Sequence, residues 1–162
     1  MTLGQRLIQH GLFIATAESL TAGLLSSELA TEPGASGYLL GGVICYQDEI
    51  KVNLLGVDSS LIETRTAVDP EVAISLARNV REKFARESSK DIESVIGVST
   101  TGVAGPGPVE NHEAGTVFLG ISSSRGSRAV GLNLQGTRSE VRAATVTSAL
   151  AAIEDEIQAI CG

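Results

Sequence analysis

The sequence predicts a single layered α/β domain over residues 1–162, with a mixed β-sheet flanked by helices. Apolar residues alternate along the chain between helix-like and strand-like spacing, and strands separated by helices are typical of layered α/β domains. Two late apolar segments, 116–123 and 127–134, flank Arg125-Gly126 and indicate a β-hairpin. Because a hairpin pairs its strands antiparallel, we expect a mixed sheet rather than an all-parallel one.

The first third of the chain is predicted to alternate helices with strands. Gly56 is expected to end the last helix of this part, because glycine readily adopts the left-handed conformation that follows a helix. In chain order, the expected elements are a short helix over 2–11, a strand over 12–16, a helix over 20–30, a buried strand over 38–46 and a short helix over 48–55.

Two later helices have recognisable N-terminal signals. Asp69-Pro70-Glu71 combines a capping residue, a first-turn proline and an acid near the positive end of the helix dipole, and we expect that helix to reach about Arg86. Thr137-Arg138-Ser139-Glu140 has the spacing of a capping box and predicts the start of the last helix. A strand over 94–99 and a loop rich in glycine and proline over 102–115 are expected between the two helices.

The composition excludes several classes of function. The formal net charge is −7 and no run of basic residues occurs, so binding to nucleic acid or to an anionic membrane is not expected. No apolar run reaches the ~18 residues of a membrane span, and residues 1–6 lack a signal-peptide pattern. Cys45 and Cys161 form no disulfide framework. We expect a cytoplasmic protein, and a homo-oligomer is as compatible with the sequence as a monomer.

A first polar cluster lies at residues 16–23, where a predicted strand gives way to a helix. Small hydroxyl residues there leave backbone N–H groups free to face an anion, and the helix dipole would assist. The alternative is purely structural, with Ser19 acting as the N-cap of the following helix.

A second cluster comprises Ser36, Tyr46, Asp48, Glu49 and Lys51. A serine becomes a nucleophile when a base removes its proton, and a buried lysine is one such base. A tyrosine between the two is able to pass a proton. The alternative is a surface lysine at a helix start that pairs with a neighbouring carboxylate.

A third cluster, residues 99–107, leads from a strand into a glycine-rich loop. Successive N–H groups of such a loop form an anion-binding nest, although a structural turn explains the glycines equally well. No Gly-Lys-Ser/Thr follows, so the loop is not of the Walker type. His10 and His112 have no paired ligand spacing, so no metal site is expected.

Together these stretches resemble the CinA C-terminal domain family, whose members include nicotinamide mononucleotide amidases. The matches occur in family order and cover nearly the whole chain. The matching stretches are residues 16–23, 34–51, 54–57, 66–73, 100–108, 114–121 and 136–142.

The resemblance implies hydrolysis of the carboxamide of a small-molecule nucleotide, nicotinamide mononucleotide, to nicotinate mononucleotide and ammonia, as in pyridine nucleotide salvage. It implies no metal and no other cofactor. Catalytic roles fall on Ser36, Tyr46, Lys51 and Ser19. Ser36 is the preferred nucleophile and Ser19 the alternative, while Lys51, assisted by Tyr46, would move the proton. The expected substrate-binding residues are Thr21, Gly23, Thr101, Gly102, Gly105 and Arg138.

The chain departs from the family pattern at four of these motif positions. Ala22, Asp69, His112 and Thr137 stand where the family usually has glycine, serine, lysine and aspartate. The missing loop lysine removes a positive charge that would suit a phosphate, which leaves open an inactive or substrate-shifted nucleotide-binding module of the same fold.

Two further classes receive less support from the sequence. A short-chain dehydrogenase would also use serine, tyrosine and lysine, but four residues rather than three separate Tyr46 from Lys51, and no dinucleotide fingerprint follows the first strand. A purely structural or interaction protein would not need polar clusters at its strand ends.

Overall fold

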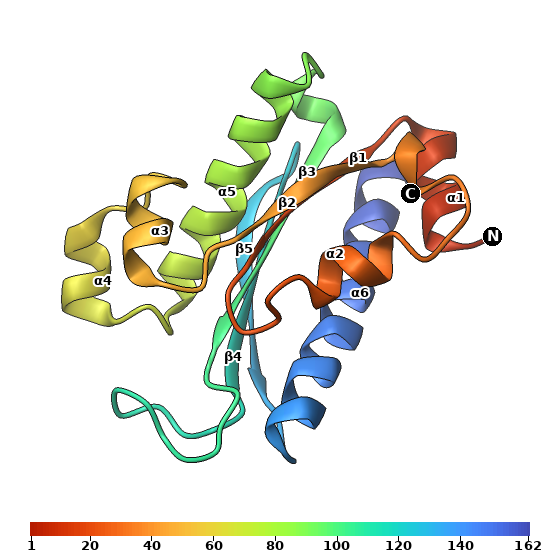
Figure 1. Ribbon diagram of the computed structural model, residues 1–162. Helices are drawn as coiled ribbons and strands as arrows, with labels where there is room; N and C mark the ends of the chain where they lie inside the picture. The colour runs from red at the N-terminus through yellow and green to blue at the C-terminus, as the bar shows by residue number, and fades with distance from the viewer.

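A five-stranded sheet forms the centre of the computed structural model, which describes all of residues 1–162 (Figure 1). The first three strands in space, β2, β1 and β3, are parallel, whereas β4 and β5 continue the sheet as an antiparallel hairpin. The mixed sheet expected from the hairpin is therefore confirmed. In spatial order the strands are β2 (Leu39–Ile44), β1 (Phe13–Glu18), β3 (Val95–Gly102), β4 (Thr116–Ser123) and β5 (Gly126–Asn133).

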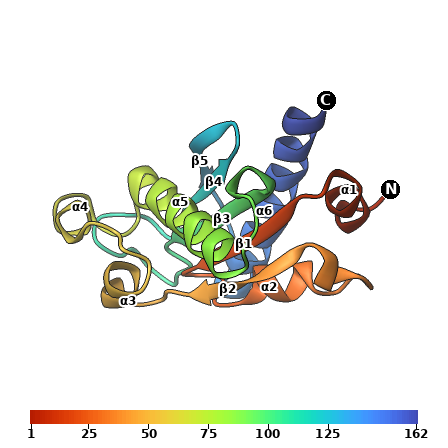
Figure 2. The ribbon, with the colours of Figure 1, turned by 90° about the horizontal axis from the view of Figure 1, so that it is seen from above.

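Helices cover both faces of this sheet (Figures 1 and 2). One layer contains α1 (Leu3–His10), α2 (Leu24–Leu29) and α6 (Arg138–Cys161), and the other contains α3 (Asp48–Asn53), α4 (Ser59–Arg65) and α5 (Pro70–Glu87). Two short 3-10 helices, η1 (Ala35–Gly37) and η2 (Ile92–Ser94), precede β2 and β3. A layered α/β domain with both sheet faces covered is the predicted fold class.

Each face of the sheet has its own apolar core. On the α6 side, Ile14 and Leu119 belong to a cluster of 19 buried residues that includes Ile153 of α6. On the α5 side, Ala15 and Leu76 belong to a smaller cluster of eight. Because the pleat sends successive side chains to opposite faces, β1 contributes alternate residues to the two cores and is almost wholly buried.

Two glycines let α5 lie unusually close to the sheet. A Cβ atom on Gly97 would lie 2.0 Å from the carbonyl oxygen of Ala77, and one on Gly120 would lie 2.1 Å from that of Ala73. The two carbonyls are four residues apart and therefore lie on one side of the helix. Any larger residue at either glycine would push α5 away from β3 and β4.

Most of the expected helices are confirmed, including their caps. Asp69 caps α5 by accepting a hydrogen bond from the N–H of Glu71, and Pro70 occupies the first turn. Thr137 and Glu140 form the expected capping box of α6. The hydrogen bond from the Thr137 backbone lowers the pKa of Glu140, as expected for a carboxylate that accepts from a helix start.

The expected helix over 20–30 is wrong in its first turn, because α2 begins only at Leu24. Ala22 and Gly23 have φ angles of 47° and 99°, which a right-handed helix excludes. β1 and β3 also continue beyond their expected ends, to Glu18 and Gly102.

The helix α4 was not expected from the sequence. Asp58 caps this helix by accepting from the N–H of Ser60. None of the helices in the structure combines the length and the hydropathy needed to cross a membrane.

Substitution of Gly120 by alanine should destabilise the fold strongly. The new methyl group would overlap the Ala73 carbonyl and the Ser99 hydroxyl, so α5 must move away from the sheet. We expect Gly120→Ala to lower the free energy of unfolding by about 3 kcal/mol, measured by urea denaturation. Gly131→Ala is the matched control, because its nearest neighbour is a Phe118 side-chain atom at 3.4 Å. Equal denaturation midpoints for the two variants would contradict the close approach of α5.

Candidate functional site

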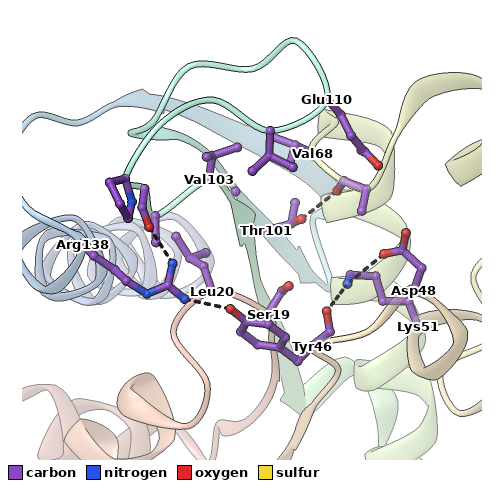
Figure 3. A pocket seen from close by; sticks show the side chains of 16 residues that line it. Ser19, Leu20, Tyr46, Asp48, Lys51, Val68, Thr101, Val103, Glu110 and Arg138 are labelled. Atoms are coloured by element: carbon purple, nitrogen blue, oxygen red, sulfur yellow. Dashed lines mark hydrogen bonds and ion pairs between the residues drawn. The ribbon is translucent and has the colours of Figure 1, made fainter.

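A cavity of about 280 Å³ lies at the carboxyl ends of the three parallel strands (Figure 3). Ser19 follows β1, Tyr46 and Lys51 follow β2, and Thr101 is the second-last residue of β3. Arg138, at the start of α6, closes the cavity from the other side. Crevices at the carboxyl ends of parallel strands are the usual ligand sites of open α/β sheets, so the topology itself singles out this place.

Lys51 is the most unusual of the lining residues, because its side chain is buried. It is only 1% exposed, and its Nζ lies 3.1 Å from the Tyr46 carbonyl oxygen and 3.3 Å from Oδ1 of Asp48. A buried ammonium group requires such partners. The alternative of a surface lysine is therefore wrong, although the expected pairing with Asp48 is present.

Ser19 presents a free hydroxyl group to the cavity. Its backbone N–H donates to the Thr100 carbonyl oxygen at 3.0 Å, which ties the residue to the end of β3. The hydroxyl has no hydrogen-bond partner within the chain, and no buried side-chain oxygen lacks a partner. The Ser19 hydroxyl therefore faces the cavity, which Lys51 also lines (Figure 3).

The turn that carries Ser19 is held by the buried carboxylate of Glu18. This side chain is 1% exposed and accepts hydrogen bonds from the N–H groups of Gly23, Leu25 and Ser26 at 2.8–3.0 Å. It also accepts from the Ser26 hydroxyl at 2.6 Å. The carboxylate thus occupies the start of α2, where the sequence analysis expected an external anion, and Ser19 is not the N-cap.

A second arginine of α6 fixes the same turn from the opposite side. Arg142 donates to the carbonyl oxygens of Leu20 and Thr21 at 2.8 and 3.2 Å. The Thr21 hydroxyl is fully buried and bonds to that of Thr100 at 2.8 Å. Sequence reasoning missed this role of Arg142, although its position one helical turn after Arg138 was the available signal.

Arg138 connects two walls of the cavity. Its guanidinium donates to the Gly105 carbonyl oxygen at 2.7 Å and to the Tyr46 hydroxyl at 2.9 Å. A guanidinium has five N–H donors, so these contacts orient it and still leave donors for a ligand. The Thr101 hydroxyl, on the floor of the cavity, donates to the Ala67 carbonyl oxygen at 2.7 Å.

Three residues that line this space also have unpaired backbone N–H groups. The N–H groups of Leu20, Ala104 and Gly105 have no hydrogen-bond partner in the chain, and all three residues line the cavity. They come from the turn after β1 and from the glycine-rich loop. Unsatisfied N–H groups on two sides of one cavity form a site for a carbonyl oxygen or an anion.

The structure does not bring all the expected residues together. Ser36 is exposed on η1, at the start of β2, whereas Tyr46 and Lys51 follow its end. The six residues of β2 span about 20 Å, so within one copy of the chain Ser36 lies far from the cavity. Thr21 and Gly23 also do not line it, while Gly102, Gly105, Thr101 and Arg138 do.

The structure adds lining residues that the sequence did not indicate. Ala67 and Val68, from the segment before α5, form part of one wall. Val103 is a further apolar neighbour, and Glu110 reaches the cavity from the tip of the long loop. Val103 belongs to the third polar cluster, residues 99–107, whereas Ala67, Val68 and Glu110 lie outside all three clusters.

The fold and the site together define an α/β domain with a polar cavity built from a serine, a buried lysine, a tyrosine and an arginine. The CinA C-terminal domain profile matches residues 1–157, and the chain belongs to this family. The resemblance seen in the motifs is thereby confirmed.

Curated relatives agree with this assignment. The chain is 42% identical over 142 residues to a putative competence-damage inducible protein of Geobacillus kaustophilus, covering 87% of this chain and 32% of the relative. It is 46% identical over 138 residues to a protein described in the same words from Shouchella clausii, covering 85% and 31%. The chain thus spans about a third of the length of the curated relatives it matches.

Solved structures share the whole fold. A competence-damaged protein (CinA) superfamily protein from Klebsiella pneumoniae matches with a TM-score of 0.86 and 25% identity, covering 96% of this chain and 93% of that one. A CinA superfamily protein from Escherichia coli matches with a TM-score of 0.83 and 29% identity, covering 92% and 83%.

Replacement of Glu18 by glutamine should destabilise the protein. The amide would present a donor to backbone N–H groups that now meet a carboxylate oxygen, and an unsatisfied buried donor costs about 1–3 kcal/mol. We expect a loss of that size in the free energy of unfolding of Glu18→Gln, measured by urea denaturation. The exposed Glu28→Gln on α2 is the control and should change it by less than about 0.5 kcal/mol. A Glu18→Gln variant as stable as this control would refute the capping role.

The two cysteines should differ sharply in reactivity. Cys45 directly follows β2 and is fully buried, and this burial raises the pKa of its thiol to about 11 even though the positive charge of Lys51 acts in the opposite direction. At pH 8 about one Cys45 thiol in a thousand would be ionised. We expect iodoacetamide to label the exposed Cys161 in the native protein and Cys45 only after unfolding, as seen by peptide mass spectrometry. Native labelling of Cys45 at the rate of Cys161 would contradict this.

Proposed function

We propose that the chain hydrolyses the carboxamide of nicotinamide mononucleotide to nicotinate mononucleotide and ammonia, with Ser19 as the nucleophile. The observation that carries the proposal is that one cavity is lined by both a free Ser19 hydroxyl and a buried Lys51 amine. Membership of the CinA C-terminal domain family supports the reaction class. Ser36, which the sequence analysis preferred, is set aside because it lies at the opposite end of β2.

The proposed reaction has two steps. Ser19 Oγ attacks the carboxamide carbon while Lys51, in its neutral amine form, accepts the hydroxyl proton, and collapse of the tetrahedral intermediate transfers that proton to the departing ammonia. A water molecule, deprotonated by the same amine, then cleaves the acyl-enzyme ester. The Tyr46 carbonyl and Asp48 hold the Lys51 side chain in position for both steps.

Two sets of backbone donors are available for the oxyanion that forms in each step. The N–H of Leu20 directly follows the nucleophile, and Ala104 and Gly105 of the long loop, whose N–H groups have no partner in the chain, line the same cavity. One such donor typically contributes about 3 kcal/mol to transition-state stabilisation. Leu20, Val68 and Val103 provide apolar contact for the pyridine ring, and Arg138 offers its remaining N–H donors to the phosphate.

The four departures from the family pattern have local structural roles in this chain. Asp69 and Thr137 cap α5 and α6, and His112 Nε2 bonds to the Thr66 hydroxyl at 3.2 Å. Ala22 adopts the left-handed conformation that the turn after Ser19 requires. These roles favour an intact site over the alternative, a nucleotide-binding module without turnover.

Ammonia release from nicotinamide mononucleotide, measured with a chelator present, tests the proposal. We expect turnover by the wild type, a loss of at least about a thousandfold in kcat for Ser19→Ala and Lys51→Met, and near-normal turnover for the matched serine variant Ser36→Ala. Circular dichroism and urea midpoints check that each variant is folded. Loss of activity in Ser36→Ala with retention in Ser19→Ala would reverse the assignment of the nucleophile. Tight binding by the wild type without ammonia would favour the non-catalytic alternative.

A further inference from the structure

The charged groups that line the cavity cancel one another. They are two cations, Lys51 and Arg138, and two carboxylates, Asp48 and Glu110. Sites that depend on a phosphate group for affinity normally gather an excess of positive charge around it. This cavity has no such excess.

The two pairs of charges are not equivalent. Lys51 and Asp48 form an ion pair with an Nζ–Oδ1 distance of 3.3 Å, so their charges compensate locally. Neither Arg138 nor Glu110 takes part in any ion pair of the chain. A bound ligand therefore experiences mainly these two opposite, uncompensated charges, which Figure 3 shows on different sides of the cavity.

Glu110 is held in place by its loop. Glu110 and Asn111 have φ angles of 49° and 67°, the left-handed pair of a type I′ turn. Two backbone hydrogen bonds of 2.9 Å join Val109 to His112 across this turn, and the His112 ring is anchored on Thr66. The backbone of Glu110 is thus fixed at a hydrogen-bonded tip, and the residue lines the cavity on the side of Val68 (Figure 3).

The charge of the substrate decides what such a carboxylate does. A nicotinamide nucleoside carries one positive charge on its pyridinium ring, which Glu110 attracts. Its 5′-phosphate adds a charge of about −2, which Glu110 repels while Arg138 attracts it. The binding free energy contributed by the phosphate is therefore reduced by the same Glu110 carboxylate that attracts the pyridinium ring.

We infer that Glu110 is a specificity-determining residue, and that the site accepts the phosphate-free pyridinium nucleoside at least as well as the nucleotide. This inference rests on the proposed amidase function for its reaction. The preference of the site between the nucleoside and the nucleotide is a property of binding, so it is measurable without turnover.

Calorimetric titration of Ser19→Ala protein with nicotinamide riboside and with nicotinamide mononucleotide measures that preference directly. We expect nicotinamide riboside to bind at least as tightly as nicotinamide mononucleotide, with dissociation constants that differ by no more than about threefold. In the double variant that adds Glu110→Gln, the nucleotide should bind about fivefold more tightly and the nucleoside more weakly, as expected for removing one charge at several ångströms in a solvated site. Glu113→Gln, an exposed carboxylate of the same loop outside the cavity, is the control and should leave both constants unchanged.

The kcat/KM of the wild type for ammonia release from each compound completes the test. A preference for the nucleotide of more than about tenfold that Glu110→Gln does not alter would overturn the role of Glu110. The expected binding pattern without ammonia from either compound would support the charge selection and overturn the proposed hydrolysis. If Glu110→Gln and Glu113→Gln changed the dissociation constants equally, the effect would come from the net charge of the loop and not from Glu110 in particular. This result would also overturn the inference.

Discussion

The buried carboxylate of Glu18 is the interaction on which the candidate site depends. Glu18 ends β1, the middle one of the three parallel strands, and its side chain turns back to accept hydrogen bonds from three N–H groups and one hydroxyl at the start of α2. A helix start needs such acceptors, and here the strand itself supplies them. The backbone of Glu18 belongs to β1, and its carboxylate is bound to the start of α2. Because the turn between these two elements is fixed at both ends, it has little conformational freedom, and Ser19 is directed into the cavity. The same contact prevents the start of α2 from binding an external anion.

The C-terminal helix is the second support of the site. Arg138 and Arg142 lie one turn apart near the start of α6 and reach the cavity and the Ser19 turn respectively. The capping box at Thr137 fixes where the helix begins and therefore where both arginines point. The far end of α6 packs against α1, where Glu154 pairs with Arg6. The site thus joins residues more than a hundred positions apart through one rigid element.

Much of the fold was predictable because its signals are local. The caps at Asp69 and Thr137 and the Arg125-Gly126 hairpin each indicate an element from a few neighbouring residues. The site was less predictable. Ser36 and Tyr46 are ten positions apart and suggested one cluster, but the strand between them carries them to opposite ends of the sheet. Glu18 was overlooked because no local pattern indicates that a strand residue will cap the next helix.

The long loop shows why glycine content alone does not identify an anion site. At the base of the loop, the N–H groups of Val103 and Gly115 bond to the Thr116 and Val103 carbonyl oxygens, so these donors are used by the fold. Gly115 is required there because the Leu134 backbone would lie 1.8 Å from a Cβ atom. Gly105 has a free N–H at the cavity, and its carbonyl oxygen receives Arg138. Glycines of one loop therefore serve packing at one end and ligand access at the other, and only the hydrogen-bond partners of each N–H distinguish the two roles.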